Sequence, residues 1–85
     1  MSRSSKFLQW MNYKVRVTIQ DSRKLVGTFI AFDKHMNLVL ADTEEYRKIE
    51  PKRPEDKESE QKRALGLVLL RGENIVTMSA EAPPS

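Results

Sequence analysis

Apolar and polar residues alternate over one stretch in the first quarter of the chain. From residue 13 to residue 20 the apolar positions are Tyr13, Val15, Val17 and Ile19. Because successive side chains of a β-strand point to opposite faces, this alternation predicts a strand with one buried face. Apolar runs predict further strands over residues 25–32, 38–49, 64–70 and 75–78. We therefore expect a mainly β fold, in which five antiparallel strands form a small, curled barrel-like sheet.

The beginning of the chain has a different spacing. Phe7, Trp10 and Met11 recur at the intervals of one helix face, and Ser4 or Ser5 offers a hydroxyl that can cap the first turn. We expect a short helix that lies across the sheet, with Trp10 as a packing residue rather than a stacking platform.

Two features predict how the strands turn. Gly27 interrupts an apolar run, and a glycine inside a strand usually marks a bend or the close approach of another backbone. Asp21 and Ser22 predict a tight turn, in which serine costs more than glycine wherever positive φ is required. A strongly bent sheet is the expected result.

Residues 51–63 break the apolar pattern. They contain two prolines and a run of charges of mixed sign, a composition that buries too little apolar surface to order itself. We interpret them as a mobile loop within a single domain that spans residues 1–82. Residues 83–85 would then be the C-terminal stub of a possible tail.

Residues 64–70 are apolar at nearly every position, so both faces of this strand need cover. A neighbouring subunit supplies that cover if the strand pairs head-to-tail with residues 75–78 of the next subunit, and such contacts can close into a ring. A central strand buried inside a monomer explains the pattern equally well. The predicted subunit-interface residues are Leu67, Val68, Leu69, Leu70, Ile75, Val76 and Met78.

Composition removes several classes of function. The chain has no cysteine and a single histidine, so we expect no disulfide, no metal site and no cofactor, and we expect association with other subunits to support a small core. Acidic neighbours such as Glu44 and Glu45 do not form a sheltered acid–base pair, which argues against an enzyme. No signal peptide and no apolar run of ~20 residues is found, so we expect a soluble intracellular protein. The net charge of +3 is compatible with a polyanionic partner.

Two short loops concentrate planar and hydrogen-bonding side chains. The first holds the imidazole of His35 and the carboxamide of Asn37, and the second holds the guanidinium of Arg71 beside Gly72. Single-stranded RNA is read with such groups, because unstacked bases stack on planar side chains and hydrogen-bond through their edges.

Each of these residues also has a plainer interpretation. His35 can be a solvent-exposed loop residue, Asn37 can satisfy backbone groups of its own loop, and Arg71 can belong to an ordinary hairpin turn. Asp33 is expected to organise its loop by accepting hydrogen bonds from backbone amides, and Met36 is expected to pack beneath it.

The same stretches resemble the two motifs of the Sm family. Residues 26–40 carry a glycine, an aspartate, a methionine and an asparagine at the intervals of the first motif, and residues 67–76 are similar to the second. The resemblance extends over roughly residues 8–84. It implies the Sm fold, a short N-terminal helix followed by a strongly bent five-stranded antiparallel sheet.

The resemblance also implies partners and roles. The chain would join six other Sm proteins, D-type Sm proteins among them, in a ring around a uridine-rich single strand of spliceosomal RNA, in the nucleus after assembly in the cytoplasm and without a membrane partner. His35 would stack on one base, Asn37 would hydrogen-bond its Watson–Crick edge, Arg71 would cover the opposite face, and Gly72 would let the RNA approach the backbone.

Two other functions remain open. One is an Sm-like ring that acts in RNA decay or chaperoning, and the other is a small barrel that serves as a protein-interaction adaptor without RNA specificity. Ser22 stands where many family members have glycine, and the chain ends near the point at which a tail rich in proline and arginine-glycine pairs begins in some family members.

Overall fold

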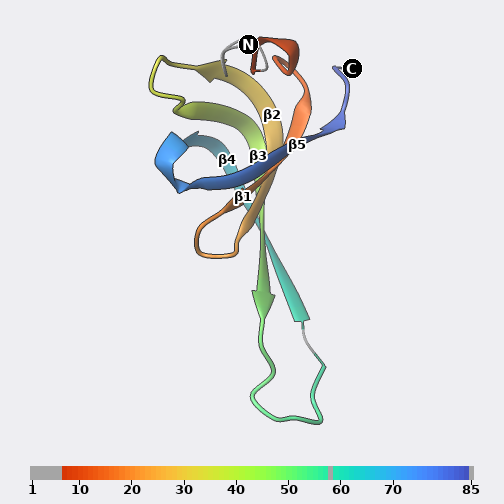
Figure 1. Ribbon diagram of the computed structural model, residues 1–85. Coiled ribbons are helices and arrows are strands. Elements are labelled where there is room, and N and C mark those ends of the chain that lie inside the picture. Colours follow the sequence, from red (N-terminus) through yellow and green to blue (C-terminus); the bar gives the residue numbers. More distant parts are fainter. Residues whose placement is uncertain (1–6, 58, 85) are drawn as a thin grey trace.

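A computed structural model describes residues 7–57 and 59–84 of this chain. Five antiparallel strands form one sheet in the order β4-β3-β2-β1-β5 (Figure 1). The strands are β1 (Lys14–Ile19), β2 (Lys24–Phe32), β3 (Leu38–Ile49), β4 (Ser59–Leu70) and β5 (Ile75–Ala82). The mainly β prediction is confirmed, since each predicted strand is present.

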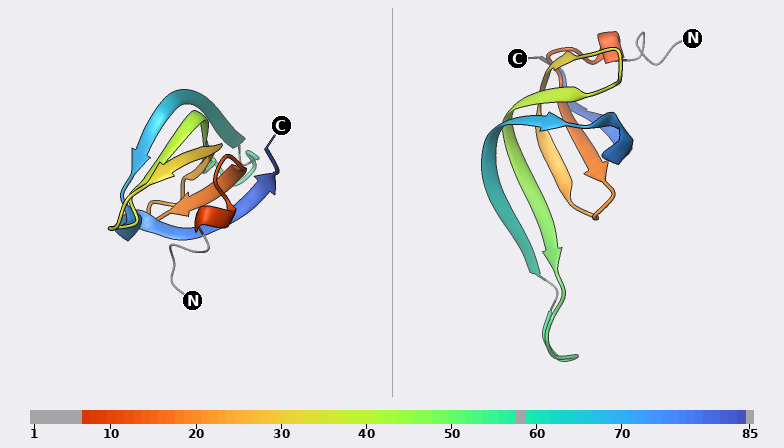
Figure 2. Two further views of the ribbon diagram at one scale, coloured as in Figure 1. Left: turned by 90° about the horizontal axis from the view of Figure 1, so that it is seen from above. Right: turned by 90° about the vertical axis from the view of Figure 1, so that its left-hand side faces the viewer.

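A short helical segment, residues 7–9, lies at one end of the sheet (Figure 2). Phe7, Trp10 and Met11 pack against the core, as their spacing predicted. The Phe7 ring meets the rings of Phe29 and Phe32 edge-on, with centroids 5.8 Å and 5.5 Å away. The predicted cap, Ser4 or Ser5, lies outside the described residues. Within the described residues, no helix is long and apolar enough to cross a membrane.

The core lies on one face of the bent sheet, and the alternation along the chain produces it. The three core residues of β1, Val15, Val17 and Ile19, are buried. They pack in one cluster with five more buried apolar side chains, which are Leu25, Phe29, Leu38, Leu40 and Leu70. The polar residues between them in β1 consequently point to the opposite face of the sheet.

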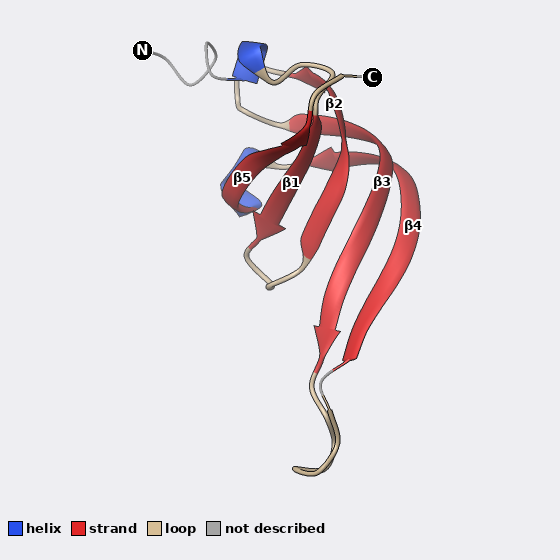
Figure 3. Ribbon diagram, turned by 90° about the vertical axis from the view of Figure 1, so that its right-hand side faces the viewer, coloured by secondary structure: helices blue, strands red, loops and turns tan. Residues whose placement is uncertain are grey.

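The sheet bends where glycine permits it (Figure 3). A Cβ atom on Gly27 would lie 2.7 Å from Thr43 Oγ1 and 3.0 Å from the carbonyl oxygen of Ala41, so no side chain fits between β2 and β3 at this point. Gly66 in β4 has φ +77°, and Asp42 in β3 has φ 52°, at the place where the register between these strands shifts. Such irregularities increase the local bend and twist of a sheet.

The turn between β1 and β2 uses a serine in a left-handed conformation. Ser22 has φ 70°, so the strained conformation anticipated from the sequence is present. Arg23 offsets this cost, because its guanidinium donates to Asp21 Oδ2 over 2.7 Å and to Glu45 Oε2 over 2.8 Å. Glu45 is buried, and a buried carboxylate needs such a partner.

The loop predicted for residues 51–63 is too long. Residues 59–63 belong to β4 and pair with residues 45–49 of β3, so the hairpin projects well beyond the rest of the sheet (Figure 1). Backbone hydrogen bonds hold this part, and it therefore needs no apolar side chains. An ion pair of 2.7 Å between Lys62 and Glu44 adds to it. Strand β5 likewise continues beyond Met78 to Ala82.

The two outer strands of the sheet, β4 and β5, carry exposed apolar side chains. Leu67 is 71% exposed, Leu69 is 69% exposed and Val76 is 58% exposed. The other predicted interface residues lie differently: Leu70 is buried in the chain's own core, and Val68, Ile75 and Met78 are partly buried against it. Only part of the predicted set is thus turned outward.

Candidate nucleic-acid interface

The loop between β2 and β3 is built around one carboxylate. Asp33 Oδ1 accepts hydrogen bonds from the backbone N–H groups of His35, over 2.9 Å, and of Asn37, over 3.0 Å. The backbone N–H of Met36 also donates to the carbonyl oxygen of Asp33 over 3.0 Å, and Met36 itself has φ 64°. The organising role expected for Asp33 is confirmed. Met36 is half-buried, and its packing beneath the loop stays a prediction.

The Asn37 side chain joins the two loops. Its Nδ2 donates to Asp33 Oδ2 over 2.9 Å, and its Oδ1 accepts from the backbone N–H of Gly72 over 3.2 Å. These two partners fix which end of the amide is nitrogen and which is oxygen. A carboxamide has two N–H donors and two acceptor lone pairs, so one of each remains for a ligand. Asn37 therefore combines a structural role with a free amide edge.

Gly72 is a glycine because the two loops touch. A Cβ atom at this position would lie 2.6 Å from the carbonyl oxygen of Met36 and 3.0 Å from that of His35. Real Cβ atoms essentially never approach other atoms to less than 3.0 Å. Close packing of the loops is thus a reason for the glycine that the sequence did not indicate, and the expected approach of RNA to this residue stays a prediction.

A short 3-10 turn, η1 (Gly72–Asn74), connects β4 to β5 and ends the second loop. The backbone N–H of Asn74 donates to the carbonyl oxygen of Arg71 over 3.0 Å. Gln20 holds the turn from the other side, because its Nε2 donates to the carbonyl oxygen of Glu73 over 3.1 Å. These contacts hold the backbone beside Arg71, whose side chain is exposed.

A hollow of about 380 Å³ lies where the loops meet, lined by His35, Asn37, Leu69, Arg71 and Glu73. The fold thus brings three of the predicted RNA-binding side chains to one place, with Gly72 adjoining them. Arg71 lies 3.8 Å from Glu73, and both side chains are about three-quarters exposed. Such an exposed pair is weak, so the guanidinium is available to a ligand. Glu73 was not predicted here, although it is next to Gly72 in sequence.

The electrostatics of the hollow centre on Asp33 and Arg71. The pKa of Asp33 is lowered, chiefly because the Asn37 side chain donates to its carboxylate, with further contributions from the backbone amides of Asn37 and His35. The carboxylate therefore stays ionised and holds the loop in one conformation. An imidazole, a guanidinium and a fixed amide edge around one hollow suit a planar ligand with hydrogen-bonding groups on its rim.

An apolar groove runs from the helical segment to β5, beside the hollow. Its volume is about 310 Å³, and its lining consists of Phe7, Trp10, Met36, Gly72, Ile75, Val76, Thr77 and Met78. Gly72 lines this groove and donates its backbone N–H to Asn37, which lines the hollow, so the groove and the hollow are neighbours.

Fold and motifs together define an LSM-domain protein, and the chain belongs to this family: the LSM domain model matches residues 5–80. It is 60% identical over 84 residues to the small nuclear ribonucleoprotein-associated protein B of Dictyostelium discoideum. It is 48% identical, also over 84 residues, to the probable small nuclear ribonucleoprotein-associated protein B of Caenorhabditis elegans. Each match covers 99% of this chain but only 30% and 52% of the respective relative.

The chain is also similar to a subunit of another complex and to a solved structure. The NatC auxiliary subunit of Schizosaccharomyces pombe, N-alpha-acetyltransferase 38, is 34% identical over 73 residues, which is 86% of either chain. Among solved structures, a heptameric archaeal Sm protein superimposes with a TM-score of 0.65 at 28% identity, covering 91% of this chain and 97% of that one. The Sm fold is therefore confirmed. The family is structural rather than enzymatic, which also confirms that this domain is not an enzyme.

Proposed function

We propose that this chain is an RNA-binding subunit of the heteroheptameric Sm ring of spliceosomal small nuclear ribonucleoproteins. It binds one base of a uridine-rich single strand and so contributes to pre-mRNA splicing. The observation that carries the proposal is the hydrogen bond from Gly72 to Asn37, which joins the two motif loops around one hollow. The identity to ribonucleoprotein-associated B proteins supports the same assignment.

The base is held by its faces and by its edge. His35 stacks on one face and Arg71 covers the other, while the free N–H and lone pair of Asn37 pair with the edge of uracil, which offers both an acceptor and a donor. Stacking on a side chain contributes about 1–3 kcal/mol per base. One such site binds weakly, but several in one ring act at high effective concentration. The modest net charge of +3 agrees with affinity that comes from several weak sites rather than from one strongly basic surface.

The ring forms through the two outer strands. β4 of one subunit pairs with β5 of the next, which extends the sheet from one protein to its neighbour. Leu67 and Leu69 then leave solvent, and the apolar groove beside β5 offers an apolar surface for a neighbouring subunit. The partners are other Sm proteins, with D-type Sm proteins among them. The particle acts in the nucleus after assembly in the cytoplasm.

The proposal is tested by mixing the chain with candidate Sm partners and a uridine-rich oligonucleotide. Assembly mass and RNA retention are measured for the native chain and for a His35→Ala, Arg71→Ala double variant. We expect both proteins to enter the ring and the variant ring to retain RNA less well. A Lys34→Ala, Lys57→Ala variant is the control, because it removes exposed side chains that do not line the hollow.

Sites on other subunits can mask the loss of one pocket. Crosslinking from a photoreactive uridine to His35 or Arg71 reports on this subunit alone. Unchanged retention together with no crosslink to either residue would remove the hollow from RNA recognition.

A second candidate function is a protein-interaction adaptor, and the NatC auxiliary subunit favours it because that relative matches over most of its length. In this case the exposed strand β4 docks a protein partner, and the oligonucleotide binds without preference for uridine. An Sm-like ring in RNA decay or chaperoning is a third candidate. It is distinguished by which subunits co-purify with the chain.

A further inference from the structure

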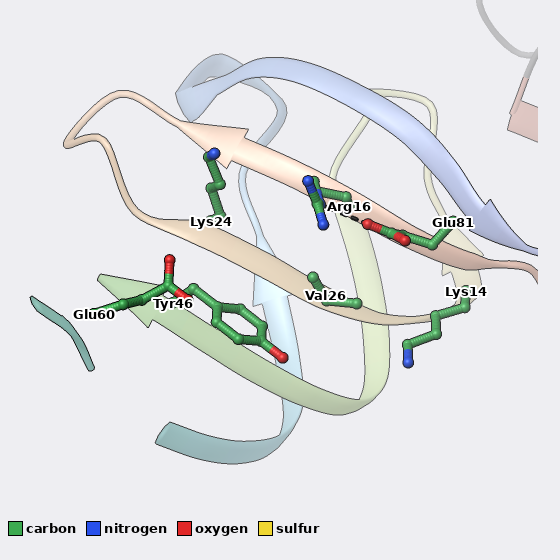
Figure 4. Close-up of a pocket in the computed structure, with 7 residues that line it drawn as sticks. All are labelled: Lys14, Arg16, Lys24, Val26, Tyr46, Glu60 and Glu81. Carbon is green, nitrogen blue, oxygen red and sulfur yellow. Dashed lines mark ion pairs between the residues drawn. The ribbon is translucent and has the colours of Figure 1, made fainter. Parts of the chain in front are cut away.

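A second surface lies on the side of the sheet opposite the core, and we call it the polar face (Figure 4). Two adjoining hollows of about 240 and 330 Å³ share Lys24, Tyr46 and Glu60. The first also includes Lys14, Arg16, Val26 and Glu81, and the second Thr18, Ser22 and Lys48. These residues come from all five strands and from the β1–β2 turn. Strand alternation points the side chains of the strand residues away from the core.

Positive charge on the polar face exceeds negative charge. Together with the Lys62–Glu44 pair beside Tyr46, five cations face three carboxylates, which gives a net charge of +2. The whole chain carries only +3, so most of its excess charge lies here. The cations are Lys14, Arg16, Lys24, Lys48 and Lys62, and the carboxylates are Glu44, Glu60 and Glu81.

Two of these cations are already paired, and three are not. Arg16 contacts Glu81 over 2.6 Å, and Lys62 contacts Glu44 over 2.7 Å. Within residues 7–57 and 59–84, no ion pair involves the other three, which are Lys14, Lys24 and Lys48. All three are exposed. Their charge is therefore available to an anion.

Strand register places one of these lysines, Lys24, in a row with Tyr46 and the paired cation Lys62, while Lys48 lies opposite Glu60. Lys24 in β2 is the cross-strand partner of Tyr46 in β3, and Tyr46 is the partner of Lys62 in β4. The Lys62 ammonium lies 5.9 Å from the centre of the Tyr46 ring. Neighbouring strands are about 4.8 Å apart, so cations flank the aromatic ring on both sides. The three unpaired lysines lie on three adjacent strands, Lys14 on β1, Lys24 on β2 and Lys48 on β3, and this spread suits an extended polyanion better than a small ion.

The polar face adjoins the RNA hollow around the edge of the sheet. Glu73 lines that hollow, and Gln20 of the β1–β2 turn donates to the Glu73 carbonyl oxygen. A further small hollow includes Gln20, Arg23 and Asn74, and the next residue, Lys24, belongs to the polar face. Of the acidic groups along this path, Asp21 contacts Arg23 over 2.7 Å, whereas Glu73 has only the weak, exposed pair with Arg71.

We propose that the polar face binds the phosphate backbone of the RNA strand that leaves the base hollow, independently of sequence. This assignment rests on the proposed function, which supplies the RNA. Lys14, Lys24 and Lys48 contact phosphates, and the path past the β1–β2 turn carries the strand to them. Phosphate contacts of this kind position a nucleic acid without reading its bases. They make binding salt-dependent, since each one releases counterions.

The test uses the ring assembled with its partners and two RNAs, a uridine-rich oligonucleotide alone and the same one with a single-stranded extension. A Lys14→Gln, Lys24→Gln, Lys48→Gln variant is compared with a Lys52→Gln, Arg53→Gln, Lys57→Gln control, which loses the same charge from the β3–β4 loop. Affinity is measured over a range of salt concentrations. The thermal midpoints of both variants establish that they fold.

We expect the extension to raise the RNA affinity of the native ring and of the control ring, but not that of the ring with the polar-face variant. Its slope of log affinity against log salt for the extended RNA should fall by about 2, because about 0.7 counterions are released per phosphate contact on a single strand and three contacts are removed. Binding of the short oligonucleotide should not change.

Three outcomes overturn the assignment. If the ring retains the short oligonucleotide and the two variants give equal slopes, this assignment is overturned while the proposed function stands. Binding to polyglutamate is measured in parallel. If the polar-face variant keeps the RNA slope but loses binding to polyglutamate, the polar face binds an acidic protein instead. Failure of the native ring to retain the short oligonucleotide overturns the proposed function and this assignment with it.

Discussion

The backbone N–H of Gly72 donates to Asn37 Oδ1 over 3.2 Å, across 35 positions of sequence. This contact fixes the position of one motif loop relative to the other. It also sets the orientation of the Asn37 amide, whose nitrogen is held by Asp33. The hollow between the loops therefore exists before any ligand arrives, and little conformational freedom is lost on binding.

Replacing Gly72 by alanine should separate the loops. The new Cβ would meet the Met36 carbonyl oxygen at 2.6 Å, so the backbone must shift. We expect the free energy of unfolding to fall by about 1–3 kcal/mol, as for other overpacked sites. Chemical denaturation measures the loss, and the amide resonances of His35 and Asn37 should move. Glu73→Ala, an exposed neighbour, should leave both observables unchanged.

The loop of residues 33–37 should loosen in acid. The pKa of Asp33 is below its ordinary value of 3.8 because Asn37 donates to the carboxylate. A lowered pKa means that the ionised form stabilises the fold, so this contribution is complete above the ordinary value and is lost as pH falls through the folded-state pKa. Amide resonances of His35 and Asn37 followed by NMR during acidification report the transition.

The control for this titration is Asp33→Asn, which has no carboxylate to protonate. Its loop resonances should already differ at neutral pH, because an amide nitrogen would face Asn37 Nδ2. They should then show no transition in the acid range. A transition of the same size in this variant would mean that another group causes it.

Gly66 and Gly27 should respond differently to alanine. Gly66 has φ +77° with no atom within 4 Å of a new Cβ, so the cost is conformational, about 1 kcal/mol, and asparagine should restore part of it. Gly27 lacks space, so Gly27→Ala should cost more, about 1–3 kcal/mol. Unfolding free energies of the three variants test the distinction. Equal losses for Gly66→Ala and Gly66→Asn would contradict the conformational explanation.

Leu67→Ser should weaken assembly while sparing the single chain. Leu67 is 71% exposed, so the free energy of unfolding should change by less than about 0.5 kcal/mol. Sedimentation with ring partners should show reduced association. Leu40→Ala is the opposite case, because Leu40 is fully buried, and it should cost about 2–5 kcal/mol of stability. Undiminished association of Leu67→Ser would remove this side chain from the joint.

The sequence predicted those parts of the fold in which side chains alternate. Val15 and Val17 identify β1 because one face of this strand is buried. The beginning of β4 was predicted wrongly, since residues 59–63 are exposed and are held by backbone hydrogen bonds to residues 45–49. Side-chain character carries no signal where only the backbone ladder orders a segment.

The candidate site was predicted as a set of residues but not as a geometry. His35, Asn37 and Arg71 do line one hollow. The contact between Asn37 and Gly72 depends on how two distant loops meet, which local spacing does not encode. The reason for glycine at position 72 and the inclusion of Glu73 follow from the same tertiary contact.

The order of the strands puts β4 and β5 at opposite edges of one sheet, so each molecule carries both halves of the proposed β4–β5 joint. Pairing can then continue indefinitely unless the circle closes, and uncapped growth of this kind gives fibres. From the proposed joint we predict that a shortage of partner subunits favours open polymers of this chain over closed rings.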